Sequence, residues 1–142
     1  MKSNGKIQSK ERLCQIPVYE KLAFRIKNEP YRGTQSPTDI DLYFEYQNNL
    51  AIIGEFKMEG ARMPNGQRIT LTRMVDALSH TYNGVYLIVA THSTPIMEPF
   101  YDASITRVRQ VYFNGKWQTP NKDVLFGDMW YSLLVKHNII KE

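Results

Sequence analysis

The sequence contains very little cysteine and no long hydrophobic run, and each absence excludes a class of protein. The single cysteine, Cys14, provides neither a disulfide framework nor a cysteine-based zinc site, which fits a reducing compartment. No apolar stretch approaches the roughly 20 residues that a transmembrane helix needs, so we expect no membrane partner. The first residues, MKSNGKIQSKERLC, are polar and basic without the apolar segment of a secretory signal. We therefore expect a cytoplasmic protein.

Several common catalytic motifs are also missing. The three histidines, His80, His92 and His137, lie far apart in the sequence, and none has a second ligand at helical spacing. No serine stands in a nucleophile-elbow context. The glycines do not form a phosphate-cradling loop. These observations argue against a serine hydrolase and against a histidine-based metal site.

What is present indicates a globular protein of one domain. The chain has 142 residues, of which 42% are apolar and 23% charged, enough for a sizeable core. We expect a single domain over residues 1–142, with residues 1–12 as a flexible arm. The formal net charge of +4 gives a mild preference for polyanionic partners.

Hydrophobic periodicity and turn residues predict an α/β fold, with a central mixed sheet flanked by helices. Residues 16–28 fit either a helix or a strand, and 29–39 read as a loop. The remaining elements are a hairpin at about 40–47 and 50–57, a helix over 66–83 stopped by Gly84, a buried strand over 85–92, a hairpin over 105–119 and a helix over 123–138. Asn114-Gly115 suits a type I′ turn in the second hairpin.

Both predicted helices carry an apolar stripe. In the first, the stripe consists of Leu71, Met74, Val75 and Leu78. In the last, it consists of Phe126, Met129, Trp130, Leu133 and Leu134, which suits either the core or a dimer face. A homodimer with two-fold symmetry is the commonest closed assembly.

The first hairpin gathers charged residues at one end. Side chains alternate along a strand, so Glu55 and Lys57 share a face. Asp41 lies beside Glu55 only if paired residue numbers in the hairpin add to an even value. A two-residue Asn48-Asn49 turn would give an odd sum. The arrangement therefore requires an odd-length loop such as 47–49, or a bulge.

A convergence of carboxylates at this end would suit a metal ion. Two neighbouring carboxylates stay ionised at neutral pH when a cation lies between them. Oxygen ligands suit Mg²⁺ or Mn²⁺, which polarise phosphoryl oxygens and activate water. Lys57 would reach the same centre, and the carbonyl of Phe56 is a further candidate ligand.

Asp41, followed by Glu55-Phe56-Lys57 at the end of an apolar strand, resembles the PD-(D/E)xK nuclease superfamily. The layout of IDLYFEYQNNLAIIGEFK is similar to the nuclease domains of RecB-like enzymes. The segment PNGQRITLTRMVDAL, with Gln67 at a helix start, is also similar to small nuclease-like proteins of phages and prophages. The resemblance implies a restriction-endonuclease-like fold in the cytoplasm of a bacterial or phage-infected cell.

The same resemblance implies a site and an activity. Asp41 and Glu55 would bind Mg²⁺ or Mn²⁺, Lys57 would be catalytic, and Gln67 would position the water or substrate. The implied activity is Mg²⁺-dependent hydrolysis of phosphodiester bonds in DNA. Asp39 and Glu20 are secondary candidates as metal ligands, and the choice between Asp39 and Asp41 stays open.

Five arginines are candidates for contact with nucleic acid. Arg62, Arg68 and Arg73 lie in or after the loop that follows Lys57. Arg107 and Arg109 alternate along the second hairpin, where the aromatic residues Tyr112 and Trp117 are interleaved. This strip suits either phosphate contact with base stacking, or a solvated strand face whose aromatic rings pack on the sheet.

Two other functions fit the same residues. One is a non-catalytic nucleic-acid-binding module, although clustered acids repel phosphate. The other is a regulatory protein, for example a phage-encoded inhibitor, whose hairpin acids lie at a solvated edge. The second alternative predicts no binding of divalent metal and an Asp41 that points away from Glu55.

Overall fold

The computed structural model describes residues 38, 40–94 and 101–141. The helices and strands within them all belong to one compact unit, Ile40–Ser93 together with Asp102–Glu142. The strands are β1 (Leu42–Tyr46), β2 (Leu50–Met58), β3 (Gly84–His92), β4 (Arg107–Phe113) and β5 (Lys116–Gln118). The helices are α3 (Asn65–Leu78), the short 3₁₀ helix η1 (Ala103–Ile105) and α4 (Phe126–Lys136).

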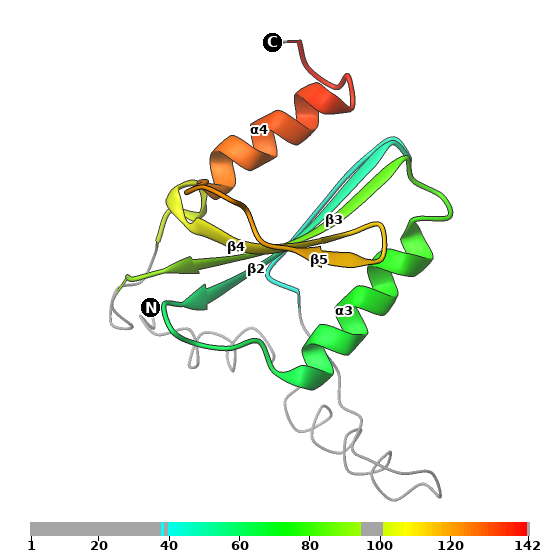
Figure 1. The fold of residues 1–142 in the computed structure, drawn as a ribbon. Coiled ribbons are helices and arrows are strands. Elements are labelled where there is room, and N and C mark those ends of the chain that lie inside the picture. The colour runs from blue at the N-terminus through cyan, green and yellow to red at the C-terminus, as the bar shows by residue number, and fades with distance from the viewer. Residues whose placement is uncertain (1–37, 39, 95–100, 142) are drawn as a thin grey trace, which may run out of the picture. The chain divides into compact units, whose positions relative to one another are not determined.

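The fold is α/β, with a mixed sheet of five strands in the order β1-β2-β3-β4-β5 (Figure 1). Only the β2–β3 pairing is parallel, and the other three are antiparallel. A parallel pair needs a crossover connection, which α3 provides between β2 and β3. Two helices and a mixed sheet agree with the coarse fold class that the sequence predicts.

The loop of the first hairpin sets the register of β1 against β2. Tyr46 pairs with Leu50, so residues 47–49 form a three-residue loop. Gln47 and Asn48 adopt φ angles of +46° and +58°, and the Asn49 N–H donates to the Tyr46 carbonyl at 2.8 Å. All paired residue numbers add to an even value, as in Tyr43 with Ile53. The odd-length loop that the site hypothesis requires is therefore present.

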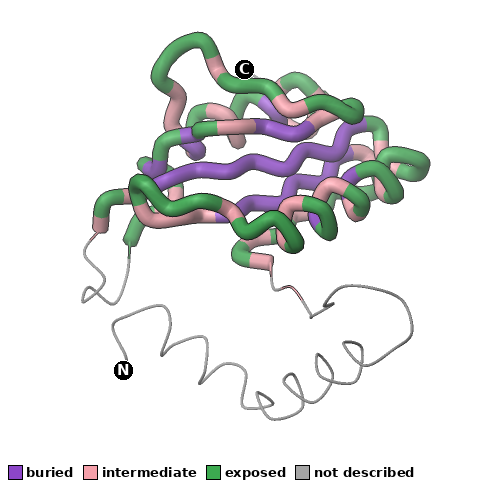
Figure 2. Tube along the Cα trace, turned by 60° about the horizontal axis from the view of Figure 1, so that its bottom comes forward, coloured by how far each residue is buried: buried purple, intermediate pink, exposed green. Residues whose placement is uncertain are grey.

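The core lies on both faces of the sheet. On the α3 face, buried residues of β2, β3 and β4 pack against the helix, and the cluster consists of Ala51, Ile53, Leu71, Val75, Val85, Leu87 and Tyr112. On the α4 face, the buried cluster consists of Leu50, Ile52, Tyr86, Ile88, Ala90, Val108, Val111, Phe126 and Leu133. Figure 2 shows these buried segments along the central strands. The predicted strand 85–92 is indeed covered on both faces.

The last helix turns its apolar stripe into this core. Phe126 and Leu133 are buried, and Met129, Trp130 and Leu134 pack against the same cluster. Figure 1 shows α3 and α4 on opposite sides of the sheet. The core interpretation of this stripe is therefore correct.

The prediction that the first of these helices runs to residue 83 was wrong. Helix α3 ends at Leu78, and Gly84 is the first residue of β3 rather than a helix stop. The Ser79 hydroxyl donates to the Val75 carbonyl at 2.7 Å and competes for the last turn. A Cβ on Gly84 would lie 2.4 Å from the His137 ring. Glycine is needed here because the His137 ring packs where a side chain would begin.

The second hairpin has the predicted turn. Phe113 pairs with Lys116, and the intervening Asn114 and Gly115 have φ angles of +55° and +78°, as a type I′ turn requires. The register of β4 against β3 shifts between Val89 and Ala90, which marks a β-bulge.

Several predictions concern residues outside the described part of the chain. These are the arm at 1–12, the ambiguous segment 16–28, nearly all of the loop at 29–39, and the candidate ligands Glu20 and Asp39. Among the described residues, no helix combines the length and the apolar character that a membrane crossing requires.

Candidate active site

Glu55 is a buried carboxylate at the end of β2. Its side chain is 1% exposed and lies on the face of the sheet that α3 covers, as its alternation with Ala51 and Ile53 requires. Burial of a charge is costly unless hydrogen bonds compensate it. The Gln67 amide donates to Glu55 Oε1 at 2.8 Å, and the Asp41 N–H donates to Oε2 at 3.1 Å.

Asp41 lies next to Glu55, just before β1 begins. Its Oδ2 atom accepts a hydrogen bond of 2.9 Å from the Phe56 N–H. The Asp41 N–H also donates to the Glu55 carboxylate. This reciprocal pair of hydrogen bonds joins the two chain segments at the open end of the hairpin. The side chain of this exposed residue therefore points toward β2.

The carbonyl of Phe56 is directed to the same side. In an extended strand, the N–H and C=O of one residue point to the same neighbour. Because the Phe56 N–H meets Asp41, the Phe56 carbonyl is also on the Asp41 side of β2.

Lys57 and Gln67 complete the cluster from β2 and the first turn of α3. The Lys57 Nζ atom donates to Gln67 Oε1 at 3.0 Å and lies 3.7 Å from Glu55 Oε1. The same Gln67 amide group donates to Glu55. Gln67 thus links the ammonium and the buried carboxylate, and the Lys57 side chain keeps 21% of its surface exposed.

The donor set suits a hard divalent cation. Within the described ranges, no group of three or more His, Cys, Asp or Glu side chains is placed to hold a metal. Mg²⁺ does not need such a group, because one or two carboxylates with waters and substrate oxygens suffice. Asp41, Glu55 and the Phe56 carbonyl offer that set.

The structure brings together the four residues that the sequence proposes as catalytic: Asp41, Glu55, Lys57 and Gln67. Of the two secondary ligands, neither Asp39 nor Glu20 belongs to the described residues.

The candidate arginines differ in their surroundings. Arg62 and Arg73 are exposed, in the loop before α3 and on α3 itself. Arg68 lies over the Trp117 ring at 3.9 Å and donates to Gln110 at 3.4 Å.

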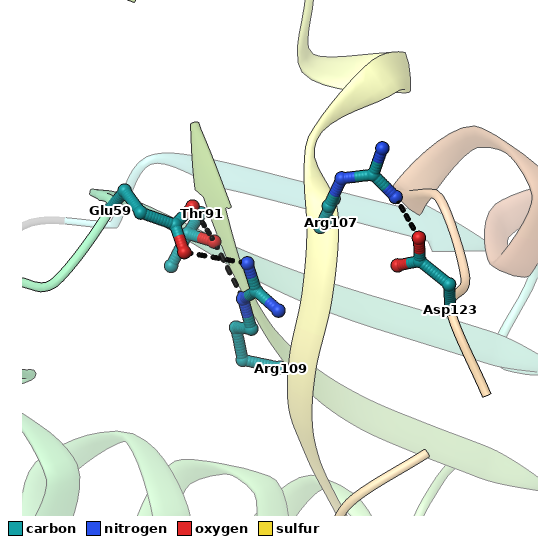
Figure 3. A network of polar contacts seen from close by, with 5 residues as sticks. All are labelled: Glu59, Thr91, Arg107, Arg109 and Asp123. Atoms are coloured by element: carbon teal, nitrogen blue, oxygen red, sulfur yellow. Dashed lines mark hydrogen bonds and ion pairs between the residues drawn. The ribbon is translucent and has the colours of Figure 1, made fainter. Parts of the chain in front are cut away.

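Arg107 and Arg109 have different carboxylate partners. Figure 3 shows their guanidinium groups on opposite sides of β4, with Arg107 paired with Asp123 and Arg109 paired with Glu59. Arg107 pairs in register with Thr91, whose hydroxyl accepts a hydrogen bond from Arg109, so both arginines lie close to the same residue of β3.

The aromatic residues of the second hairpin are packed. Tyr112 is buried and donates to Asp76 at 2.9 Å; burial and this hydrogen bond both raise the pKa of its hydroxyl. Trp117 packs against the α3-side core and is covered by Arg68. The packing alternative for these rings is therefore confirmed over base stacking.

The sequence patterns missed two residues near the cluster, Thr91 and Glu59. Thr91 pairs in register with Lys57 on the neighbouring strand, and its hydroxyl donates to Glu59 at 3.2 Å. Each residue belongs to a different element, so no local pattern connects them. The signal that could have found Thr91 is the parallel pairing of β2 with β3.

A separate pocket of about 670 Å³ lies on the α4 face of the sheet. Its walls include Tyr86 and Phe113, whose rings stack with centroids 4.5 Å apart, and Lys136 from α4. The four clustered residues do not line this pocket. The candidate active site is therefore independent of it.

Comparisons with protein-family models, with curated proteins and with solved structures find nothing that matches this chain. The case for a function therefore rests on the residues and their geometry.

Proposed function

We propose that this chain is a metal-dependent nuclease of the PD-(D/E)xK type that hydrolyses phosphodiester bonds of DNA. The observation that carries the proposal is the convergence of Asp41, Glu55, Lys57 and Gln67 at one end of the first hairpin. The order strand, strand, helix, strand over β1, β2, α3 and β3 supports assignment to the restriction-endonuclease-like fold.

Asp41 and Glu55 would hold Mg²⁺ or Mn²⁺, with the Phe56 carbonyl as a third ligand. When bound, such an ion polarises a phosphoryl oxygen and lowers the pKa of a coordinated water. The hydrogen bonds to Gln67 and to the Asp41 N–H fix the Glu55 carboxylate before any ion arrives. This preorganisation reduces the cost of assembling the site.

Lys57 is the proposed catalytic residue. Its ammonium would orient the attacking water and offset the negative charge that develops on the phosphorus oxygens. Gln67 is a positioning residue in this proposal, because its amide oxygen holds Lys57 and its amide nitrogen holds Glu55.

The two competing functions explain the geometry less well. A non-catalytic nucleic-acid-binding module has no use for two carboxylates, which repel phosphate. A regulatory protein with acids at a solvated edge predicts an Asp41 that points away from Glu55, whereas the Asp41 N–H donates to Glu55 and the Asp41 carboxylate accepts from Phe56, the next residue of β2.

A small nuclease with one active site needs a second copy or a partner to cut both strands of duplex DNA. A two-fold homodimer would provide it. Since the apolar stripe of α4 is used in the core, we propose that the dimer contact involves another surface.

The test is cleavage of labelled single-stranded, duplex, flap and four-way-junction DNA with Mg²⁺ or Mn²⁺. We expect metal-dependent cutting by the wild type and loss of at least about a hundredfold in rate for Lys57→Ala and Glu55→Ala, the range typical for acid–base and electrostatic groups. Lys116→Ala, an exposed lysine on β5, is the matched control and should retain the rate. Absence of cutting on all four DNAs would contradict the proposal.

A further inference from the structure

The β-bulge on β4 determines where Arg109 points. On β3, the neighbours Val89 and Ala90 pair with residues 110 and 108 of β4. Arg109 lies between these two partners and is therefore the extra residue of the bulge. A bulge bends its strand and redirects the side chain of the extra residue. The Arg109 side chain reaches back across β3 toward the end of β2 (Figure 3).

The Arg109 guanidinium donates to a hydroxyl oxygen and to a carboxylate oxygen. The Nε atom donates to the Thr91 hydroxyl at 2.8 Å, and Thr91 is buried, with 8% of its surface exposed. The Nη2 atom donates to Glu59 at 2.7 Å, and the Glu59 side chain is 54% exposed. One anchor is therefore fixed in the sheet, and the other is a surface carboxylate.

This anchor adjoins the candidate active site. Thr91 pairs in register with Lys57, and neighbouring strands lie about 4.8 Å apart. The guanidinium bound to Thr91 is consequently one strand away from the proposed catalytic lysine.

We propose that Arg109 binds a phosphate of the DNA substrate, and that Glu59 occupies this phosphate site in the free protein. The inference rests on the proposed nuclease function and names a substrate contact for it. The planar N–H donors of a guanidinium bind a carboxylate and a phosphate in the same geometry. An exposed ion pair contributes little free energy, and the Thr91 hydroxyl that donates to Glu59 at 3.2 Å can donate to a phosphate oxygen instead. A phosphate can therefore displace Glu59 while Thr91 keeps the guanidinium in place.

The Arg107–Asp123 pair provides an internal control. It is also an arginine–carboxylate pair on β4, with both side chains exposed, 49% and 67% respectively. Arg107 pairs in register with Thr91, but its guanidinium and Asp123 lie beyond the opposite edge of β4 (Figure 3). Glu59→Gln and Asp123→Asn change the net charge equally, but only Glu59→Gln releases Arg109.

The experiment measures binding of a fluorescent duplex DNA to the full chain by anisotropy, with EDTA present so that cleavage does not interfere. We expect Glu59→Gln to tighten binding by about two- to fivefold, the factor that corresponds to one surface ion pair. Asp123→Asn should change it by less than that. Arg109→Gln should weaken binding and lower the dependence of log K on log salt concentration by about 1.

The double variant separates a local effect from a general charge effect. In an Arg109→Gln background, Glu59→Gln should no longer tighten binding. Equal tightening by Glu59→Gln and Asp123→Asn, or tightening that persists without Arg109, would overturn the phosphate site. So would the absence of binding by both wild type and Glu59→Gln. Since cleavage with metal is scored separately, these results do not decide the nuclease proposal itself.

Discussion

Glu55 is a charged residue that the fold buries almost completely, and its partners show how this is tolerated. Its carboxylate accepts hydrogen bonds from the Gln67 side chain and the Asp41 backbone, and Lys57 lies 3.7 Å away. An apolar residue of similar volume at a buried ion pair is often no less stable. A role in stability alone is therefore a weak reason to keep the acid here, and a chemical role is a stronger one.

Removal of Gln67 tests how far Glu55 depends on it. We expect Gln67→Ala to lower the free energy of unfolding by about 1–3 kcal/mol, because a buried charged acceptor loses a donor. Urea denaturation measures the change. Gln118→Ala, at an exposed position on β5, serves as the control and should change stability by less than about 0.5 kcal/mol. Equal effects of the two substitutions would mean that Gln67 does not support the buried carboxylate.

His137 makes the stability of the fold depend on pH. Burial, and to a smaller extent the charge of Lys136, lower the pKa of the His137 ring. The unfolded state therefore binds more protons at acidic pH. The contribution of His137 to the free energy of unfolding is complete above the ordinary histidine pKa of about 6.5 and decreases as the pH falls below it. Unfolding free energies measured between pH 8 and pH 5 should show this decline.

The contribution of His137 can be isolated by substitution. His137→Gln should flatten the decline between neutral and acidic pH, whereas His80→Gln, at an exposed position, should leave it in place. A decline of the same size in both variants would assign the pH dependence to other groups.

At the scale of elements, the three-residue loop of the first hairpin decides whether a site exists. With residues 47–49 in the loop, the register of β1 brings Asp41 beside Glu55. A shift of one residue would turn Asp41 to the other face of the sheet. Strand β2 cannot compensate, because both of its faces are buried.

Deletion of Asn48 should therefore abolish DNA cleavage and metal binding, while a folded sheet remains detectable by circular dichroism. Asn48→Gly keeps the loop length and suits the φ angle of +58°, so it should preserve both activities. Retention of cleavage after the deletion would show that the register does not position the catalytic residues.

The elements were predictable from the sequence where local chemistry determines them. Asn114-Gly115 specified its turn, whereas the odd length of the first loop was only a condition that the site hypothesis imposed. The end of α3 was not predictable, since residues 79–83 carry no proline or glycine to mark a stop. The role of Gly84 depends on the ring of His137, which is distant in sequence.

At the scale of the whole molecule, the fold class followed from the order of apolar segments, but the contacts around the site did not. Asp41, Glu55 and Lys57 belong to the first hairpin and Gln67 to the start of the next helix, so a family motif in consecutive elements could group them. The Glu59–Arg109 contact joins residues 50 positions apart across a bulge. Strand alternation could not anticipate this contact.

The central claim is that the end of the first hairpin binds a divalent metal through Asp41 and Glu55. The most direct test is titration of the protein with Mn²⁺, followed by electron paramagnetic resonance of the free ion, for the wild type, Asp41→Asn and Glu55→Gln. Asp123→Asn removes an exposed carboxylate elsewhere and is the control. We predict that the wild type and Asp123→Asn bind Mn²⁺ equally, and that the two hairpin variants lose most of this affinity. Binding that is absent in the wild type, or unchanged in all three variants, would contradict the claim.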